Sequence, residues 1–226
     1  MFVLVFGGIN QKAALRRAKY AFDLKEFSKE LESKVEAIPN EKRMDPNVHT
    51  VCTALDNMRY CVEEPELRQM FSSLIANSLN SDTCEKVHPS YGEIIKQLTG
   101  FDASLIIWMK GRMGVPTIRF HIEHKEKDEL IQIPLIYIDY GTDAFDKLQV
   151  SLENLSRLKI IDLKLNETYA DRSIYDEVKK TERYLKDKEE FEKEAGSVYD
   201  GYGKIEETYG SIEITQFGRK FIEACC

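Results

Sequence analysis

The sequence lacks the long apolar run that a membrane-spanning helix needs. Its most apolar stretch, the opening MFVLVFGG, has six apolar residues before its glycines, whereas a helix that crosses a bilayer needs about 20. The stretch also lacks the charged flank of a secretion signal. We therefore expect no transmembrane helix, and we interpret these residues as a buried strand or as the start of a helix.

The spacing of the cysteines is not that of a metal or redox site. The five cysteines are an odd number and include no Cys-x-x-Cys pair. In a chain without a recognisable signal peptide, this pattern indicates reduced thiols and a cytoplasmic location. The adjacent Cys225 and Cys226 do not form the C-a-a-X pattern of prenylation. We interpret them as residues at the end of a helix.

Catalytic signatures are also missing. The chain contains no P-loop, no Gly-x-Ser-x-Gly and no His-Glu-x-x-His motif. His121 and His124 lie three residues apart on a predicted strand, so their side chains should point to opposite faces and not share a metal ion. We expect no cofactor and no metal, and the sequence favours a protein without catalytic activity. A hydrolase or nuclease hidden in the helical half is the alternative.

Positive charge is in deficit. The chain has 32 lysines and arginines against 39 aspartates and glutamates, a formal net charge of −7. Nucleic-acid binding depends on clustered lysine and arginine, so this balance disfavours it and leaves open only a local basic patch. A hydrophobic content of 42% indicates a folded protein and not a disordered one.

Helical periodicity dominates the first 100 residues. Apolar side chains recur every three or four positions over residues 10–38 and again over 47–60. A third helix should begin at Pro65, because proline is well tolerated in the first turn. We therefore assign residues 1–100 to a helical region.

The densest run of potentially reactive side chains is VHPSYGE. Pro89 suits the start of a helix, and Ser90 and Glu93 have the spacing of a capping box, in which each side chain binds the backbone N–H of the other residue. This predicts a structural role for both. No nucleophile or carboxylate partner lies at a meaningful spacing from His88. We expect His88 to form a local hydrogen bond and not to act in catalysis.

The following segment contains two helix boundaries and then a change of period. We expect Gly100 to end one helix in the left-handed conformation and Asp102 to cap the next. Alternating apolar residues over 116–140 predict a β-hairpin with a KEKDE turn. Pro134 cannot donate to a ladder, so its strand should lie at an edge or carry a bulge.

The C-terminal part has the order helix, strand, excursion, strand, helix, which is the layout of a winged helix. We expect Ser151 to cap the first of these helices and Thr215 the last. The excursion, residues 166–209, is acidic, with eight basic and twelve acidic residues over 171–209, and we expect it to carry a charged helix near residues 174–194. Residues 101–226 are therefore predicted to form a modified winged-helix-like region with an inserted β-hairpin and an enlarged charged wing. The fold class is α+β and mainly helical.

The end of the predicted recognition helix is the candidate interaction surface. It presents Asn154, Arg157 and Lys159. Asparagine and arginine can read adenine and guanine, yet they are also common on helix surfaces, and an acidic wing repels phosphate. We favour packing or protein contact over sequence-specific DNA binding.

Several stretches resemble the bacterial abortive-infection alpha family, a domain of unknown function linked to phage defence. They are FSKELESKVEAIPNEKRMDP, ALDNMRYCVEEPELRQMFSSLIANSLNSDTCEKVHPSYGEIIKQLTGFDASLI, SLENLSRLKIIDL and GSIEITQFGRKFIEAC. The VHPSYGEIIKQL run is the most specific, and its motif residues, which we expect to be mainly structural, are His88, Pro89, Ser90, Glu93 and Lys96. Lys159 stands where many such proteins have glycine, and Thr99-Gly100-Phe101 replaces a more usual Ser-Pro-Leu.

The resemblance implies a bacterial cytoplasmic protein of phage defence, in which an infected cell stops growing or dies before virus is released. It supplies no reaction and no catalytic residues. We expect action through contact with an unidentified phage or host protein. A winged-helix DNA-binding transcriptional regulator is the alternative, and the apolar start leaves self-association open.

Overall fold

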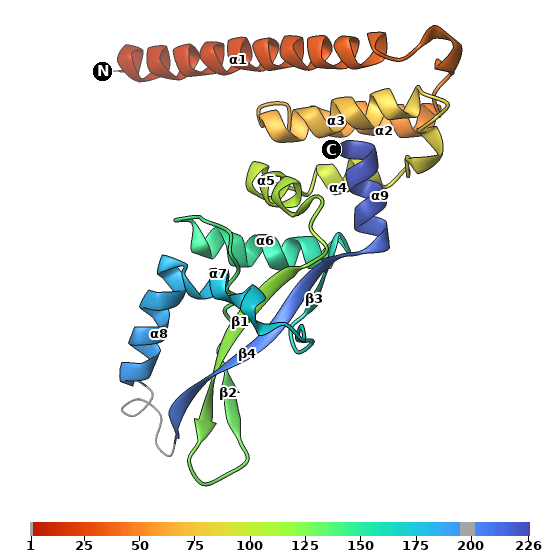
Figure 1. The fold of residues 1–226 in the computed structure, drawn as a ribbon. Coiled ribbons are helices and arrows are strands. Elements are labelled where there is room, and N and C mark those ends of the chain that lie inside the picture. The colour runs from red at the N-terminus through yellow and green to blue at the C-terminus, as the bar shows by residue number, and fades with distance from the viewer. Residues whose placement is uncertain (1, 195–201) are drawn as a thin grey trace. The chain divides into compact units, whose positions relative to one another are not determined.

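The computed structural model describes residues 2–194 and 202–226 (Figure 1). The chain divides into two compact units. The helical unit comprises Met1–Trp108 and Arg219–Cys226, and the sheet unit comprises Met109–Gly218. Of residues 2–13 and 202 only the backbone is described. The predicted division after residue 100 stays a prediction, since compactness does not test whether either part folds alone.

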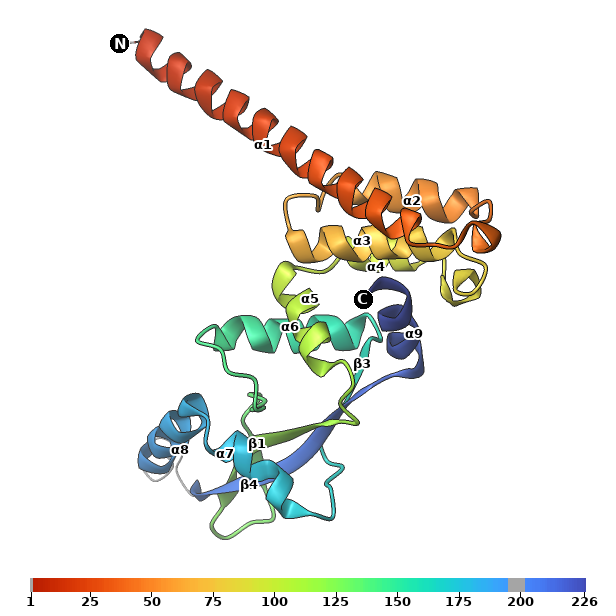
Figure 2. The same cartoon turned by 45° about the horizontal axis from the view of Figure 1, so that its top comes forward.

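Helices build the helical unit, as the periodicity predicted. They are α1 (Phe2–Glu36), α2 (Val48–Met58), α3 (Pro65–Ser78), α4 (Tyr91–Ile95), α5 (Gly100–Met109) and the last part of α9 (Gln216–Cys225), with short 3-10 turns at Asn40–Lys42 and Cys84–Lys86. The first predicted helix begins earlier than expected, at Phe2, and the expected burial of the MFVLVFGG side chains lies outside the described residues. Both views show α1 extending beyond α2 and α3 (Figures 1 and 2).

The core of the helical unit lies where α1, α2 and α4 pack around α3. Phe27 of α1 and Phe71 of α3 are almost fully buried. Arg68 of α3 fixes the register of α1, because its Nε lies 3.0 Å from a Glu30 carboxylate oxygen and its Nη1 lies 3.6 Å from Asp23. The apolar stripe predicted on α1 therefore packs inward along its C-terminal half.

A four-stranded antiparallel sheet forms the sheet unit, in the order β2-β1-β4-β3. Its elements are β1 (Val115–His124), β2 (Leu130–Gln132), α6 (Phe145–Arg157), β3 (Ile161–Lys164), a 3-10 turn (Arg172–Tyr175), α7 (Asp176–Lys179), α8 (Glu182–Glu194) and β4 (Tyr202–Ile214). The α+β class is therefore confirmed. Pro134 follows the edge strand β2, which agrees with the prediction that its segment lies at an edge.

Strand β4 changes the interpretation of the predicted hairpin and wing. β1 pairs with β4 along its whole length, for example Ile118 with Tyr209, whereas only three residue pairs join β1 to β2. The end of the predicted wing, 202–209, is therefore sheet. The expected single helix near residues 174–194 is a 3-10 turn followed by α7 and α8. The predicted hairpin is formed by β1 and β2. The predictions of a wing over 202–209 and of a single helix were wrong, and acidic residues on the outer half of β4 hid its strand pattern.

Three predicted helix ends also need correction. Gly100 is not left-handed but opens α5, where Thr99 and Asp102 form the reciprocal cap: Asp102 Oδ2 accepts from Thr99 N at 2.8 Å, and Thr99 Oγ1 accepts from Asp102 N at 3.1 Å. Asp102 is thus the third residue of the helix and not its cap. Ser151 is buried inside α6, because that helix begins at Phe145.

The cap at Thr215 is confirmed. Its Oγ1 accepts a hydrogen bond from the backbone N–H of Gly218 at 2.8 Å, three residues into α9. The Thr215 N–H in turn donates to the Ile160 carbonyl oxygen at 3.1 Å, which ties the start of α9 to the segment before β3.

Lys159 ends α6 in a left-handed conformation, with φ of 60°. The Ile160 N–H reaches the Leu155 carbonyl and the Lys159 N–H reaches the Ser156 carbonyl, both at 3.0 Å, which is the Schellman arrangement. Glycine is favoured at this position because a Cβ is strained there. The geometry explains why a glycine would suit the site where this chain has lysine.

We expect Lys159→Gly to raise the free energy of unfolding by about 1 kcal/mol, because it removes the Cβ that strains the left-handed backbone. The lysine side chain is exposed, so its loss should cost little packing. Glu153→Gly, in the exposed interior of the same helix, should lower the free energy of unfolding by a similar amount. Urea denaturation of both variants provides the measurement. Equal destabilisation by the two glycines would contradict the left-handed turn.

Candidate functional site

The family-motif residues around α4 are held by local hydrogen bonds. His88 Nδ1 lies 2.7 Å from Ser90 Oγ and accepts from the Ser90 backbone N–H at 3.1 Å. The expected local bond of His88 is therefore confirmed. The capping box is not formed: Ser90 has helical dihedral angles and no side-chain cap bond, and Glu93 accepts instead from Asn57 Nδ2 of α2 at 2.6 Å.

Residues of this motif pack α4 against α2 and α9. Tyr91 is 2% exposed and meets Phe221 of α9 edge-on, with ring centroids 5.3 Å apart, and burial raises its pKa to about 12. A Cβ at Gly92 would sit 3.4 Å from the Ala54 backbone, so the α4 and α2 backbones approach closely. Lys96 lies over the Tyr60 ring at 5.6 Å. The mainly structural role expected for the motif residues stays a prediction.

Asn154, Arg157 and Lys159 lie together at the C-terminal end of α6, on the sheet unit. Arg157 Nη2 donates to Asn154 Oδ1 at 2.8 Å. Arg157 and Lys159 are exposed and Asn154 is half-buried. The structure thus brings the three predicted residues together, and their role as an interaction surface stays a prediction.

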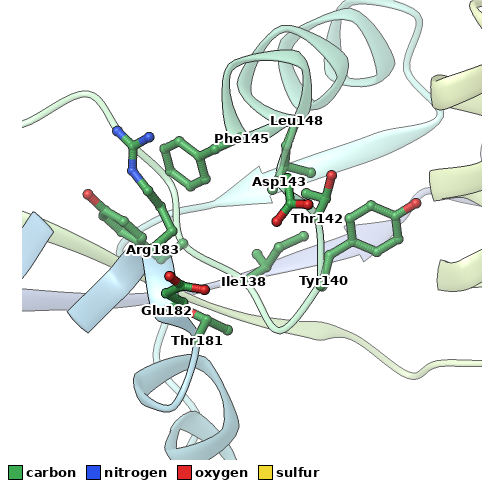
Figure 3. A pocket seen from close by; sticks show the side chains of 11 residues that line it. Ile138, Tyr140, Thr142, Asp143, Phe145, Leu148, Thr181, Glu182 and Arg183 are labelled. Atoms are coloured by element: carbon green, nitrogen blue, oxygen red, sulfur yellow. The ribbon is translucent and has the colours of Figure 1, made fainter. Parts of the chain in front are cut away.

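A pocket of about 240 Å³ lies elsewhere in the sheet unit (Figure 3). Its wall combines the loop before α6, the first turns of α6 and the start of α8, and the residues labelled in Figure 3 are Ile138, Tyr140, Thr142, Asp143, Phe145, Leu148, Thr181, Glu182 and Arg183. Sequence reasoning missed this site. The YGTD cluster signals a loop, but no local signal places that loop beside residues about 40 positions further along the chain.

The floor of the pocket is apolar and its rim is charged. Ile138, Phe145 and Leu148 are buried, whereas Asp143 and Glu182 are exposed. These side chains offer an apolar recess bordered by negative charge. Such a recess can accept an apolar or aromatic side chain, with a positively charged group of the same ligand near the rim.

Arg183 is the cation of this rim, and a buried network fixes it. Its Nε donates to Asp187 at 2.7 Å and its guanidinium lies 4.5 Å from the centroid of the Phe145 ring. The hydrogen bond to Asp187 raises the pKa of Arg183. Tyr137 donates its hydroxyl to the same carboxylate at 2.7 Å, and burial, followed by that bond, raises the pKa of Tyr137. Tyr137 therefore stays protonated and is unsuited to act as a base.

The described ranges 2–194 and 202–226 contain no group of three or more histidine, cysteine, aspartate or glutamate side chains that could hold a metal ion. His121 Nδ1 lies 2.8 Å from Thr208 Oγ1, and His124 Nδ1 accepts from the backbone N–H groups of Glu126 and Lys127 at 3.1 Å. Within that part of the chain, no helix combines the length and the apolar character that crossing a bilayer demands.

The profile of the family described as abortive infection alpha matches residues 19–225, nearly the whole chain. The chain belongs to this abortive infection alpha family. No curated protein matches the sequence. A solved structure, that of an uncharacterised protein from the marine bacterium Alcanivorax borkumensis SK2, aligns with a TM-score of 0.37 and 14% identity over 59% of this chain and 90% of that chain. A likeness of this size carries no inference about fold or function.

Proposed function

We propose that this member of the abortive infection alpha family acts in phage defence in the cytoplasm, by binding a phage or host protein and not by catalysis. The observation that carries the proposal is the family match over residues 19–225. The chemistry of the described sites is compatible with it, because the motif histidine and the buried tyrosines are engaged in structural contacts.

The pocket of Figure 3 is the contact that we assign to the partner. Its volume of about 240 Å³ suits one inserted side chain better than a drug-sized ligand, for which pockets of roughly 300–1,000 Å³ are usual. Protein interfaces commonly place such an anchor in a desolvated recess surrounded by polar groups. An aromatic or long apolar side chain over Ile138 and Phe145, next to a basic residue near Asp143 and Glu182, is the expected complement.

The winged-helix likeness stays part of the proposal. It is supported by the order α6, β3, β4, α9 and by the antiparallel pairing of Ile161–Lys164 with the end of β4. In this interpretation the module is modified for protein contact, with Asn154, Arg157 and Lys159 contributing a second patch. A regulator that reads DNA with the same three residues would instead bind duplexes with a steep salt dependence, and absence of binding at low salt would eliminate it.

The charge-reversed double variant Asp143→Arg with Glu182→Arg tests the pocket. Both residues are exposed, so the fold should persist, but a partner's basic group would meet repulsion. We expect protection against phage, measured as the efficiency of plaque formation, to fall about tenfold or more. Glu190→Arg with Glu192→Arg is the matched control, because it makes the same charge change on exposed positions of α8. Equal loss in both variants would contradict a role of the pocket.

A further inference from the structure

The N-terminal half of α1 differs from the rest of the chain in charge. Residues 2–22 contain Lys12, Arg16, Arg17 and Lys19 and no aspartate or glutamate. These residues therefore carry a formal charge of +4. Because the whole chain carries −7, the remaining residues together carry −11. A basic segment of this kind in an acidic protein indicates a partner with a negatively charged surface.

The same half of α1 exposes apolar side chains. Leu15 is 65% exposed and Phe22 is 60% exposed, and Arg16 and Arg17 beside them are exposed as well. Among the residues whose side chains are described, burial on α1 begins at Asp23. The helix extends beyond α2 and α3 in both views of the helical unit (Figures 1 and 2).

The sequence at the start of this helix is apolar. Each residue from Phe2 to Ile9 is either apolar or glycine, so the stretch contains no polar or charged side chain. Apolar turns followed by a set of lysines and arginines are typical of helices that lie in the interface of an anionic bilayer, with the apolar part among the acyl chains and the cations at the headgroups.

We propose that residues 2–22 of α1 bind peripherally to the surface of an anionic lipid membrane. A second copy of the chain fits less well, because it would bring two sets of four positive charges together where the helices pair side by side. The phosphates of a nucleic acid would complement the positive charges, but a nucleic acid offers no apolar surface for the apolar turns. This inference concerns a different surface from the pocket of Figure 3 and does not depend on it.

Flotation of the full chain with lipid vesicles tests the proposal. Vesicles of phosphatidylcholine with added phosphatidylglycerol should carry the protein upward, vesicles of phosphatidylcholine alone should not, and salt should release it. Arg16→Glu with Arg17→Glu should reduce binding at least about tenfold. Arg219→Glu with Lys220→Glu, an equal charge change on neighbouring exposed residues of α9, should bind like the unchanged protein.

A second variant separates the contribution of the apolar surface. Leu15→Ser with Phe22→Ser should also weaken flotation, while far-ultraviolet circular dichroism shows an unchanged helix content. The proposal is overturned if neither vesicle binds. It is equally overturned if the Arg219 and Lys220 control loses as much binding as the Arg16 and Arg17 variant. Without vesicle binding, a dimer that the Leu15 and Phe22 variant dissociates would assign the surface to a second copy. Duplex binding abolished by Arg16→Glu with Arg17→Glu would assign it to nucleic acid.

Discussion

Gly218→Ala is expected to lower the free energy of unfolding by about 3 kcal/mol. An added Cβ at this position would fall well inside van der Waals contact of the Ile160 carbonyl oxygen. That oxygen also accepts the Thr215 N–H, so it cannot move away without loss of the bond that anchors the start of α9. The obstructing carbonyl is a backbone group, so relief would require the helix or the segment before β3 to shift.

Chemical denaturation of Gly218→Ala beside Gly141→Ala measures this effect. No atom lies within 4 Å of a Cβ built at Gly141, and its φ lies outside the left-handed region. The change at Gly141 should therefore alter stability by no more than about 0.5 kcal/mol. If Gly218→Ala were as mild as this control, the close approach of α9 to Ile160 would not be correct.

Glu207→Gln is the second change with a large expected effect. Glu207 of β4 is 15% exposed and accepts from the lysines of α7 and α8, Lys179 at 2.8 Å and Lys188 at 2.9 Å, as well as from the hydroxyls of Tyr184 and Tyr209. Burial alone would raise its pKa, but these hydrogen bonds outweigh that effect and lower the pKa to about 2. The carboxylate therefore holds α7 and α8 on the sheet.

The difference between that pKa and the ordinary value of 4.5 corresponds to about 3 kcal/mol of stability. Because the folded-state pKa is depressed, this contribution is fully present above pH 4.5 and is lost as the pH falls toward 2. We expect Glu207→Gln to cost about that amount at neutral pH and little near pH 2, where about half of the native carboxylate is itself protonated.

Denaturation of the native chain and of Glu207→Gln across this pH range gives the difference directly. Glu190→Gln, an exposed carboxylate of α8, serves as the control and should change stability little at any pH. A gap between native chain and Glu207→Gln that stayed constant from pH 7 to pH 2 would show that the charge of Glu207 does not stabilise the fold.

The sequence predicted the elements whose stabilising pattern is local. The helices α1, α2 and α3 follow apolar periodicity and a proline in the first turn, and Thr215 follows the ordinary preference for hydroxyl caps. Strand β4 was predicted only at its end, because its outer half carries Glu206 and Glu207 and its partner residues in β1 lie 78 to 97 positions earlier in the chain. Pairing over such a separation leaves no local signature.

The candidate site was less predictable than the fold. His88 formed the local hydrogen bond that was expected, because its partner Ser90 is two residues away. Glu93 did not form its expected cap bond, because Asn57 from another helix donates to its carboxylate. A reciprocal cap is formed instead by Thr99 and Asp102. The pocket combines three segments of the sheet unit. Only the folded chain brings Arg183 against Phe145, so no spacing in the sequence could indicate it.

Action in abortive infection is tested by infecting bacteria with and without this protein at low and at high ratios of phage to cells. We expect fewer plaques and survival of the culture at the low ratio, and collapse of the culture at the high ratio, because each infected cell is lost. Survival at both ratios would contradict abortive infection. No difference from unprotected cells across a broad panel of phages would contradict a role in defence.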